Sequence, residues 1–120
     1  MRVIFDNKRN IWKIELEDKK HSLSTNEFLV LTGLRDRNDR KFHHISELIF
    51  TSKISENYFR KGLNKLKKTS LVHTKGNSYK ISEIGEMVVD MIRKNQFEVM
   101  PKRNIFNLDS LKKMLSFRAE

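Results

Sequence analysis

The sequence predicts a protein of the α+β class, and three patterns support this. Residues 11–16, IWKIEL, alternate in polarity with the period of two that a half-buried strand requires. Further along, apolar residues recur every three or four positions in several stretches, as on one face of an α-helix. Two short β-like runs then surround a Gly-Asn pair, which is typical of a hairpin.

The length of 120 residues bounds the number of domains. It suits one hydrophobic core and is marginal for two, so we expect one domain over residues 1–95 and a C-terminal extension over residues 96–120. The chain is 38% hydrophobic and 33% charged, with eight Phe, which is typical of a globular protein rather than a disordered one.

The charge is strongly basic and unevenly distributed. Twenty-five Lys and Arg against fifteen Asp and Glu leave a net charge of +10, with a pI near 10. Residues 53–80 hold eight basic side chains and one acid, Glu56, so this segment carries +7 of the total. Such clustering favours a polyanionic partner, nucleic acid first and an anionic membrane second.

Cysteine is absent, which excludes disulfides and thiolate metal sites and fits a reducing compartment. No apolar run approaches the length of a membrane span, and the N-terminus lacks the apolar stretch of a signal peptide. We therefore expect a cytoplasmic protein with no membrane partner.

The N-terminal residues predict a β-hairpin. Residues 2–5 and 11–16 are β-like, and the polar residues 6–10 between them favour a turn. The alternation within the second run predicts that Trp12, Ile14 and Leu16 face the core.

Two helices are expected next. Ser24 or Thr25 can cap the first, with Glu27 three residues after Ser24 as in a capping box. This helix ends around residues 37–39, and its apolar stripe is formed by Phe28, Leu31 and Leu34, with Leu29 beside them. Residues 43–52, HHISELIFTS, predict a short second helix with Ile45, Leu48 and Ile49 inward.

The stretch SENYFRKGLNKLKKTSL predicts a third helix over residues 55–68, with Ser55 as its N-cap. One face is apolar, with Phe59, Gly62, Leu63 and Leu66. The opposite face carries amides and cations: Asn57, Lys61, Asn64 and Lys68, flanked by Tyr58, Arg60 and Lys65. Two helices joined by so short a connection form a helix-turn-helix.

A hairpin and a fourth helix follow. Residues 71–74 and 79–81 are β-like around residues 75–78, where Gly and Asn can take positive φ. Ser82 then caps a helix that runs to about Lys94, with Ile84, Met87, Val88, Met91 and Ile92 on its apolar face. Helix, short helix, third helix, hairpin and closing helix is the winged helix-turn-helix order, here with an N-terminal β-hairpin and an extra C-terminal helix.

At this point two resemblances can be given. The stretch ISENYFRKGLNKLKKTSLVHTKGNSYKISEIGEMVVDMI resembles the core of multiple-antibiotic-resistance-type regulators, with a serine-capped helix, Leu63 and Leu66, and then Tyr-x-Ile-Ser-Glu-x-Gly. The stretch IELEDKKHSLSTNEFLVL is similar to the start of the winged-helix output domains of bacterial response regulators. The chain departs from the first group at Ser70, where those regulators usually carry glycine, and its hairpin lacks arginine. The resemblances imply a winged-helix protein that binds DNA.

The outward face of the third helix is the candidate DNA-binding site. Lysines suit phosphates, and amides can bond adenine in the major groove. We expect base contacts from Asn57, Arg60, Lys61 and Asn64, and contacts to phosphate or sugar from Tyr58, Lys65 and Lys68. The hairpin and the turn before the helix would serve the backbone through Lys53, Lys75, Asn77 and Lys80, with His73 as a minor contact.

The C-terminal extension predicts a further helix after Pro101. Asn107 or Asp109 would cap it, and Leu108, Leu111, Met114 and Leu115 form one apolar stripe. Two interpretations stay open: the stripe packs on the core of its own chain, or it forms a homodimer that matches two half-sites of DNA.

We therefore expect a small transcriptional regulator that binds double-stranded DNA and stays associated with it. A protein–protein interaction module and a replication or partition initiator are the alternatives. RNA binding rests on charge alone. The paired His43 and His44 diverge on a helix and lack further ligands at suitable spacing, so no metal is expected. No catalytic triad, acid–base pair or phosphate loop is present, and we expect neither an enzyme nor a cofactor.

Overall fold

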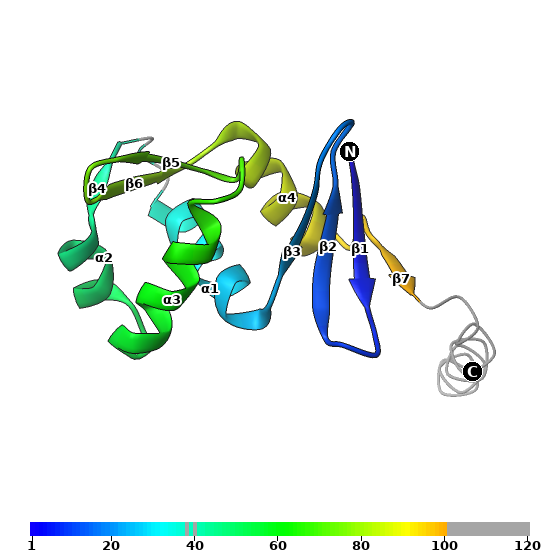
Figure 1. Ribbon diagram of the computed structural model, residues 1–120, viewed down its shortest axis with the longest axis horizontal. Coiled ribbons are helices and arrows are strands. Elements are labelled where there is room, and N and C mark those ends of the chain that lie inside the picture. The colour runs from blue at the N-terminus through cyan, green and yellow to red at the C-terminus, as the bar shows by residue number, and fades with distance from the viewer. Residues whose placement is uncertain (38, 40, 101–120) are drawn as a thin grey trace, which may run out of the picture.

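The computed structural model describes residues 1–37, 39 and 41–100 of the chain. Within these residues the protein has an α+β fold with four helices and two sheets. One sheet has four strands and the other has three. Figure 1 shows the two sheets toward opposite ends of the described part of the chain, with helices between and beneath them. The α+β class is as predicted.

The N-terminal sheet is larger than the predicted hairpin. Strands β1 (Arg2–Asp6) and β2 (Ile11–Glu15) pair antiparallel as expected, with Asn10 at φ 57° in the turn between them. Two strands that were not predicted complete the sheet, in the order β3-β2-β1-β7: β3 (Lys20–Leu23) and β7 (Glu98–Met100), which runs parallel to β1. These strands have only four and three residues, so neither is long enough to show an alternation of polar and apolar residues that would predict it.

The inward face of this sheet follows the predicted alternation. Ile14 is fully buried, and Trp12 and Leu16 pack partly buried against the same core. Trp12 also contacts the rings of Phe5 at 4.7 Å and Phe97 at 4.8 Å between centroids. The prediction that Trp12 is a core residue is therefore confirmed.

Helix α1 (Thr25–Arg37) begins and ends where the sequence indicated. The capping box forms at its start: the Ser24 N–H donates to Glu27 Oε1 at 3.3 Å, and the Glu27 N–H donates to Ser24 Oγ at 3.5 Å. Leu31 and Leu34 are buried and Phe28 is half-buried, but Leu29 is 45% exposed and does not join the core. Its place in the apolar stripe is taken by Val30, which is buried.

The second sheet contains a strand that the sequence did not reveal. Strand β4 (His43–His44) pairs with β6 (Ser78–Ile81), which pairs with β5 (Val72–Lys75), in the order β4-β6-β5. The predicted hairpin is present, but residues 43–44, predicted as helix, are strand. Its turn also differs from the prediction, because Gly76 takes a positive φ of 60° and Asn77 does not.

The two helices after β4 are α2 (Ile45–Thr51) and α3 (Glu56–Leu66). Helix α3 is shorter than predicted: its C-cap is Lys67, so Lys68 lies beyond the helix in the turn that leads to β5. Ser55 occupies the N-cap position, but its side chain makes no capping hydrogen bond. In α2, Leu48 is buried while Ile45 and Ile49 are partly buried.

Helix α4 (Glu83–Arg93) closes the fold, with the predicted cap, since Ser82 Oγ accepts from the Gly85 N–H. Val88 and Ile92 are buried as expected, whereas Met87 is 53% exposed, because it lies on the side of α4 away from its buried residues. No helix among the described residues is long and apolar enough to cross a membrane.

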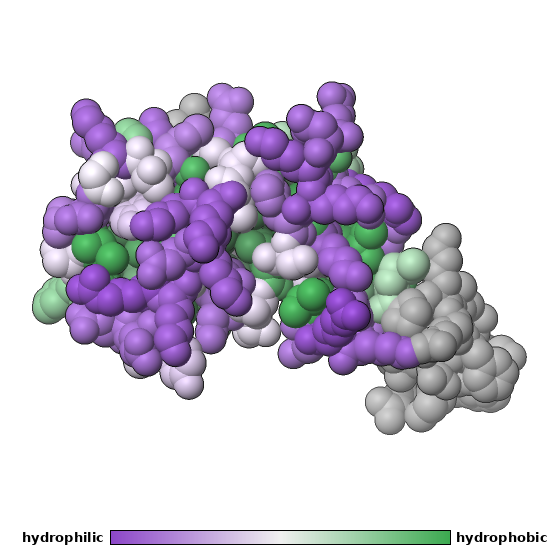
Figure 2. Space-filling model, in the orientation of Figure 1, coloured by the Kyte–Doolittle hydropathy of each residue, from purple (hydrophilic) through white to green (hydrophobic). Residues whose placement is uncertain are grey.

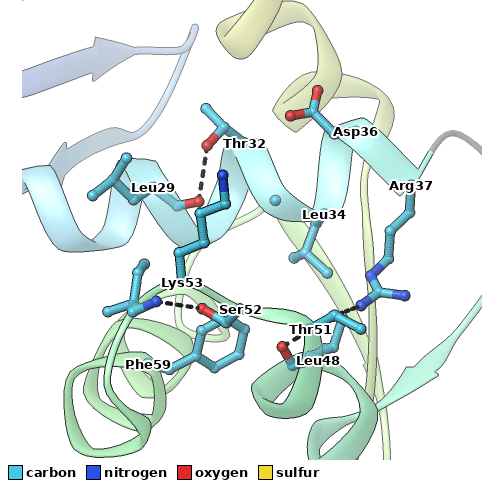
Figure 3. Close-up of a pocket in the computed structure, with 12 residues that line it drawn as sticks. Leu29, Thr32, Leu34, Asp36, Arg37, Leu48, Thr51, Ser52, Lys53 and Phe59 are labelled. Carbon is cyan, nitrogen blue, oxygen red and sulfur yellow. Dashed lines mark hydrogen bonds between the residues drawn. The ribbon is translucent and has the colours of Figure 1, made fainter.

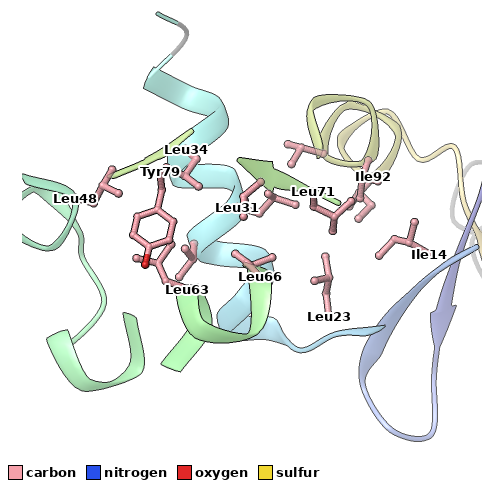
Figure 4. Close-up of a cluster of buried hydrophobic side chains, with 14 of the residues drawn as sticks. Ile14, Leu23, Leu31, Leu34, Leu48, Leu63, Leu66, Leu71, Tyr79 and Ile92 are labelled. Carbon is pink, nitrogen blue, oxygen red and sulfur yellow. The ribbon is translucent and has the colours of Figure 1, made fainter. Parts of the chain in front are cut away.

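One continuous core joins the two sheets. Figure 4 shows Leu48 and Tyr79 at one end of the buried cluster and Ile14 and Leu23 at the other. Leucines of α1 and α3 fill the middle. The helices therefore hold α3 at a defined place relative to both sheets. The predicted stripe of Leu108, Leu111, Met114 and Leu115 lies outside the described residues, and both interpretations of it remain open.

Candidate nucleic-acid interface

Helix α3 presents one buried face and one exposed face, as its periodicity predicted. Phe59, Gly62, Leu63 and Leu66 are buried. Gly62 lies so close to α1 that a Cβ added to it would be 2.9 Å from Val30 Cγ2, so the two helices pack closely here. The exposed residues of the other face are Asn57, Tyr58, Arg60, Lys61, Asn64 and Lys65. Figure 2 shows hydrophilic side chains over this region.

The cations of this face differ in their contacts. Arg60 lies 3.7 Å from Glu56 one turn earlier, an exposed pair with little effect on its availability. Lys61 is 6.0 Å from the centre of the Tyr58 ring, and the described residues place no carboxylate in contact with it. Lys61 is therefore the helix cation most available to an external anion, and the exposed amides of Asn57 and Asn64 lie on either side of it along the helix.

Lys65 has an additional intramolecular contact. Its Nζ lies 3.9 Å from Oε1 of Glu27, the buried glutamate that caps α1. The contact is loose and Lys65 stays largely exposed, so it can still approach a phosphate. Its positive charge is nevertheless partly compensated by Glu27. The two residues lie 38 positions apart, so the sequence did not indicate this contact.

The β5–β6 hairpin presents its cations on the face opposite the core. His73 pairs with Lys80 and Lys75 with Ser78, and residues paired in this way point to the same side of the sheet. Lys75 is exposed, while Lys80 is half-buried with its Nζ 4.8 Å from the centre of the Phe42 ring. Lys75 is thus the more accessible of the two cations predicted for this hairpin.

The turn of the hairpin is anchored to α2. Asn77, exposed at this turn, accepts a hydrogen bond at its backbone oxygen from the Ile45 N–H at 2.8 Å, and His44 pairs with Ser78. The start of α2 and the tip of the hairpin therefore move together.

Lys53 lies apart from this face. It lines a hollow of about 520 Å³ between α1, α2 and the connection before α3. Figure 3 shows its side chain extending along the hollow toward Leu29 and Thr32 of α1. In this arrangement Lys53 is on the side of the connection that meets α1, rather than beside Asn57 and Lys61.

A cluster that sequence reasoning missed surrounds His43. Its two ring nitrogens contact Asp39 and Glu47. The acid–histidine–acid spacing of four and four residues is visible in the sequence, but Asp39 lies outside any helix and His43 lies in β4, so the helical rule for residues four apart does not predict this contact. In the described part of the chain, no three His, Asp or Glu side chains are arranged to hold a metal ion.

Comparison of the chain with protein families, with curated proteins and with solved structures finds no match. The functional assignment therefore depends on the residues and geometry described above.

Proposed function

We propose that this chain is a winged helix-turn-helix protein that binds double-stranded DNA as a small transcriptional regulator. The observation that carries the proposal is the exposed face of α3, where Asn57, Lys61 and Asn64 stand in a row within the most basic segment of the chain. An α-helix fits the major groove of B-DNA, where amide and cationic side chains can form hydrogen bonds with base edges.

The order of elements supports the winged-helix assignment. Helices α2 and α3 are joined by four residues, 52–55, close to the connection typical of a helix-turn-helix. The hairpin follows directly, and its pairing with β4 holds it next to α2. A hairpin held in this way can contact the backbone of the same duplex that α3 enters.

The contacts divide the residues into two roles. Asn57, Lys61 and Asn64, with Arg60, are proposed to contact bases. Tyr58, Lys65, Lys68 and Lys75 are proposed to contact phosphates or sugars, where they contribute affinity without sequence preference. Lys80 and Asn77 would assist from the hairpin, whereas Lys53 would first have to turn away from α1.

Replacing Lys61 and Asn64 together with Ala tests this proposal. We expect affinity for a duplex selected from a random library to fall at least about 30-fold, since each good base contact contributes about 1–3 kcal/mol. Binding is measured by fluorescence anisotropy at fixed salt, and folding by circular dichroism.

The matched control replaces Asn7 and Lys8 with Ala. It removes the same two residue types from an exposed turn between β1 and β2. If the two double variants bind the duplex equally well, α3 is not the recognition helix.

An interaction with another protein is the second candidate, because Phe50 on α2 is 89% exposed. Phe50 precedes Thr51, one of the residues that line the hollow, so the exposed ring and the hollow together offer a surface to a partner. Capture of one partner that persists after nuclease treatment, and that Phe50→Ser abolishes, would favour this function over DNA binding.

A further inference from the structure

His43 lies between two carboxylates, one four residues before it and one four residues after it in the chain. Its Nε2 is 2.8 Å from Oδ2 of Asp39, in the loop before β4, and its Nδ1 is 3.0 Å from Oε1 of Glu47, on α2. The side chain of His43 is 12% exposed, whereas the side chains of Asp39 and Glu47 are 38% and 51% exposed.

This geometry favours a charged ring. A neutral imidazole donates from one nitrogen only, and the lone pair of the other would then face a carboxylate oxygen. An imidazolium donates from both nitrogens and satisfies both carboxylates. The contact with Asp39 raises the pKa of His43 above its ordinary value, burial opposes the increase, and the contact with Glu47 adds to it. The same contact lowers the pKa of Asp39.

The cluster joins several elements. Glu47 also accepts from Arg37 Nη1 at 3.1 Å, at the end of α1, and Arg37 donates in addition to the hydroxyl of Thr51. His43 itself pairs with Tyr79 of β6. The end of α1 therefore reaches the cluster through Glu47, and β4, which carries His43, connects it to β6.

Other charged groups face the same region. Arg35, Lys41, Lys80 and Glu86 line a small cleft with Asp39 and His43. The three cations, together with Arg37, disfavour a charged ring, and Glu86 favours it. The two carboxylates in direct contact outweigh the cations because Coulomb energy falls with distance, and Arg35 is in addition paired with Asp90 at 3.2 Å.

We propose that the imidazolium of His43 is a positioning group for DNA binding, which holds the β5–β6 hairpin and α2 in the arrangement that lets the hairpin and α3 contact one duplex. This inference rests on the proposed function. Loss of the proton turns one hydrogen bond into a repulsive contact and loosens β4, which pairs with β6 of the hairpin, from the loop before it or from Glu47 of α2. DNA affinity then falls as the pH rises.

The direction of the pH dependence follows from the two shifts. The pKa of His43 is raised in the folded chain. Its contribution to stability is therefore complete below about pH 6.5, the ordinary pKa, and is lost as the pH rises through the pKa of the folded state. Asp39 has a lowered pKa, so its contribution is lost only as the pH falls through a value below 3.8. The cluster is intact between these limits.

The first experiment needs no DNA. The ring protons of the four histidines are titrated by NMR in the full chain, together with the backbone amides of Tyr79 and Glu47. We expect His43 to titrate above 6.5, its ordinary value, and both amides to shift with the same midpoint. A midpoint for His43 at or below 6.5, or amides that do not follow it, would overturn the proposal.

The second experiment measures affinity for a mixed-sequence duplex of 20 base pairs from pH 6 to 9 at constant salt. We expect the affinity of the unmodified chain to fall at least about threefold. A pKa shift of one unit corresponds to about a tenfold change, so this fall needs only part of such a shift. His43→Gln should flatten the profile, while His21→Gln, which alters a histidine bonded to Ser70, should preserve it.

Glu47→Gln serves where His43→Gln fails to fold, because Glu47 is half exposed. It should move the midpoint to lower pH, which a direct phosphate contact by His73 would not explain. An unchanged midpoint in this variant, or an unchanged profile in His43→Gln, overturns the role of His43. If no variant binds DNA, the proposed function is overturned instead. The NMR titration then tests only whether the protonation of His43 is coupled to Tyr79 and Glu47.

Discussion

Three helical glycines differ in what a methyl group at each would meet. At Gly33, exposed on α1, a Cβ has nothing within 4 Å. At Gly62 it would lie 2.9 Å from the side chain of Val30, and at Gly85 it would lie 2.2 Å from the backbone oxygen of Leu71. The first position has open space, the second meets a buried side chain, and the third meets backbone that cannot yield.

These distances predict opposite effects of Ala on the free energy of unfolding. Gly33→Ala should stabilise the protein by about 0.5–1 kcal/mol, because Ala loses less backbone entropy in a helix. Gly85→Ala should destabilise it by more than about 3 kcal/mol. Gly62→Ala should cost about 1–3 kcal/mol through overpacking, and the helical gain from Ala offsets part of this cost. Urea unfolding measures all three, and the ranking is wrong if Gly33→Ala destabilises or if Gly85→Ala is tolerated.

Lysines within the candidate site also differ at this scale. The sequence correctly placed Lys61 and Asn64 on the exposed face of α3, because residues three apart share a side of a helix. It could not indicate that Lys65 lies near Glu27, or that Lys53 extends toward α1, because these contacts are made between different elements.

Helix caps govern the boundaries of the elements, and two serines at N-caps illustrate the range. Ser82 is buried, accepts from the Gly85 N–H at 3.0 Å and donates to the Ser70 backbone oxygen at 2.7 Å. Ser55 is exposed and makes no capping bond. The two positions look alike in the sequence, since each serine precedes a helix and is followed by Glu.

Ser82→Ala should therefore destabilise the fold by about 1–2 kcal/mol, through the lost cap and a backbone oxygen left without its donor. Ser55→Ala, the matched control, should change stability by less than about 0.5 kcal/mol. Thermal unfolding of both variants at neutral pH distinguishes them. Equal losses would mean that the Ser55 side chain does cap α3 in solution.

Helices α1 and α4 are joined by two arginine–carboxylate pairs on their exposed sides. Arg93 contacts Asp36 at 2.7 Å, and Arg35 contacts Asp90 at 3.2 Å. The hydrogen bond from Arg93 lowers the pKa of Asp36. Exposed ion pairs contribute little to the free energy of unfolding. These two pairs therefore orient the helices, and the buried residues beneath them supply most of the stability.

The strands show where local sequence fails as a guide. The hairpins β1–β2 and β5–β6 were predicted, because alternation and turn residues lie within a few positions of each other. Strands β4 and β7 are two and three residues long and pair with segments more than 30 positions away. A strand so short has no periodicity of its own, and only its partner defines it.

At the scale of the whole molecule, the net charge of +10 predicts a strong dependence of DNA binding on salt. Each phosphate neutralised by a cation releases counterions, so log K should fall linearly with log salt. Lys75→Ala should weaken binding to all duplexes and make the slope shallower by about 1. Lys8→Ala, on the distant β1–β2 turn, should leave the slope unchanged.

Affinity titrations between about 50 and 200 mM salt, the range over which such slopes are read, give this comparison. A flat plot for the unmodified chain would contradict binding through phosphates. Equal slopes for the two lysine variants would instead mean that positive charge acts from anywhere on the molecule and that the hairpin makes no contact of its own.

The sequence by itself determined the α+β class, the inward and outward faces of α3, the start of α1 and α4, and the concentration of positive charge around residues 53–80. These properties depend on spacing within one element or on composition, which a chain carries before it folds. The DNA contacts proposed for α3 are inferred from the same spacing and charge, and they remain a proposal.

Only the tertiary structure decided how the hairpin is held. Pairing of β4 with β6 and the closure of the N-terminal sheet by β7 both require distant segments to be brought together by the common core. The end of α3 at Leu66 belongs with them, because the chain turns there to bury Leu71 and Val72. Burial of a shared surface, rather than any local preference, selects these features.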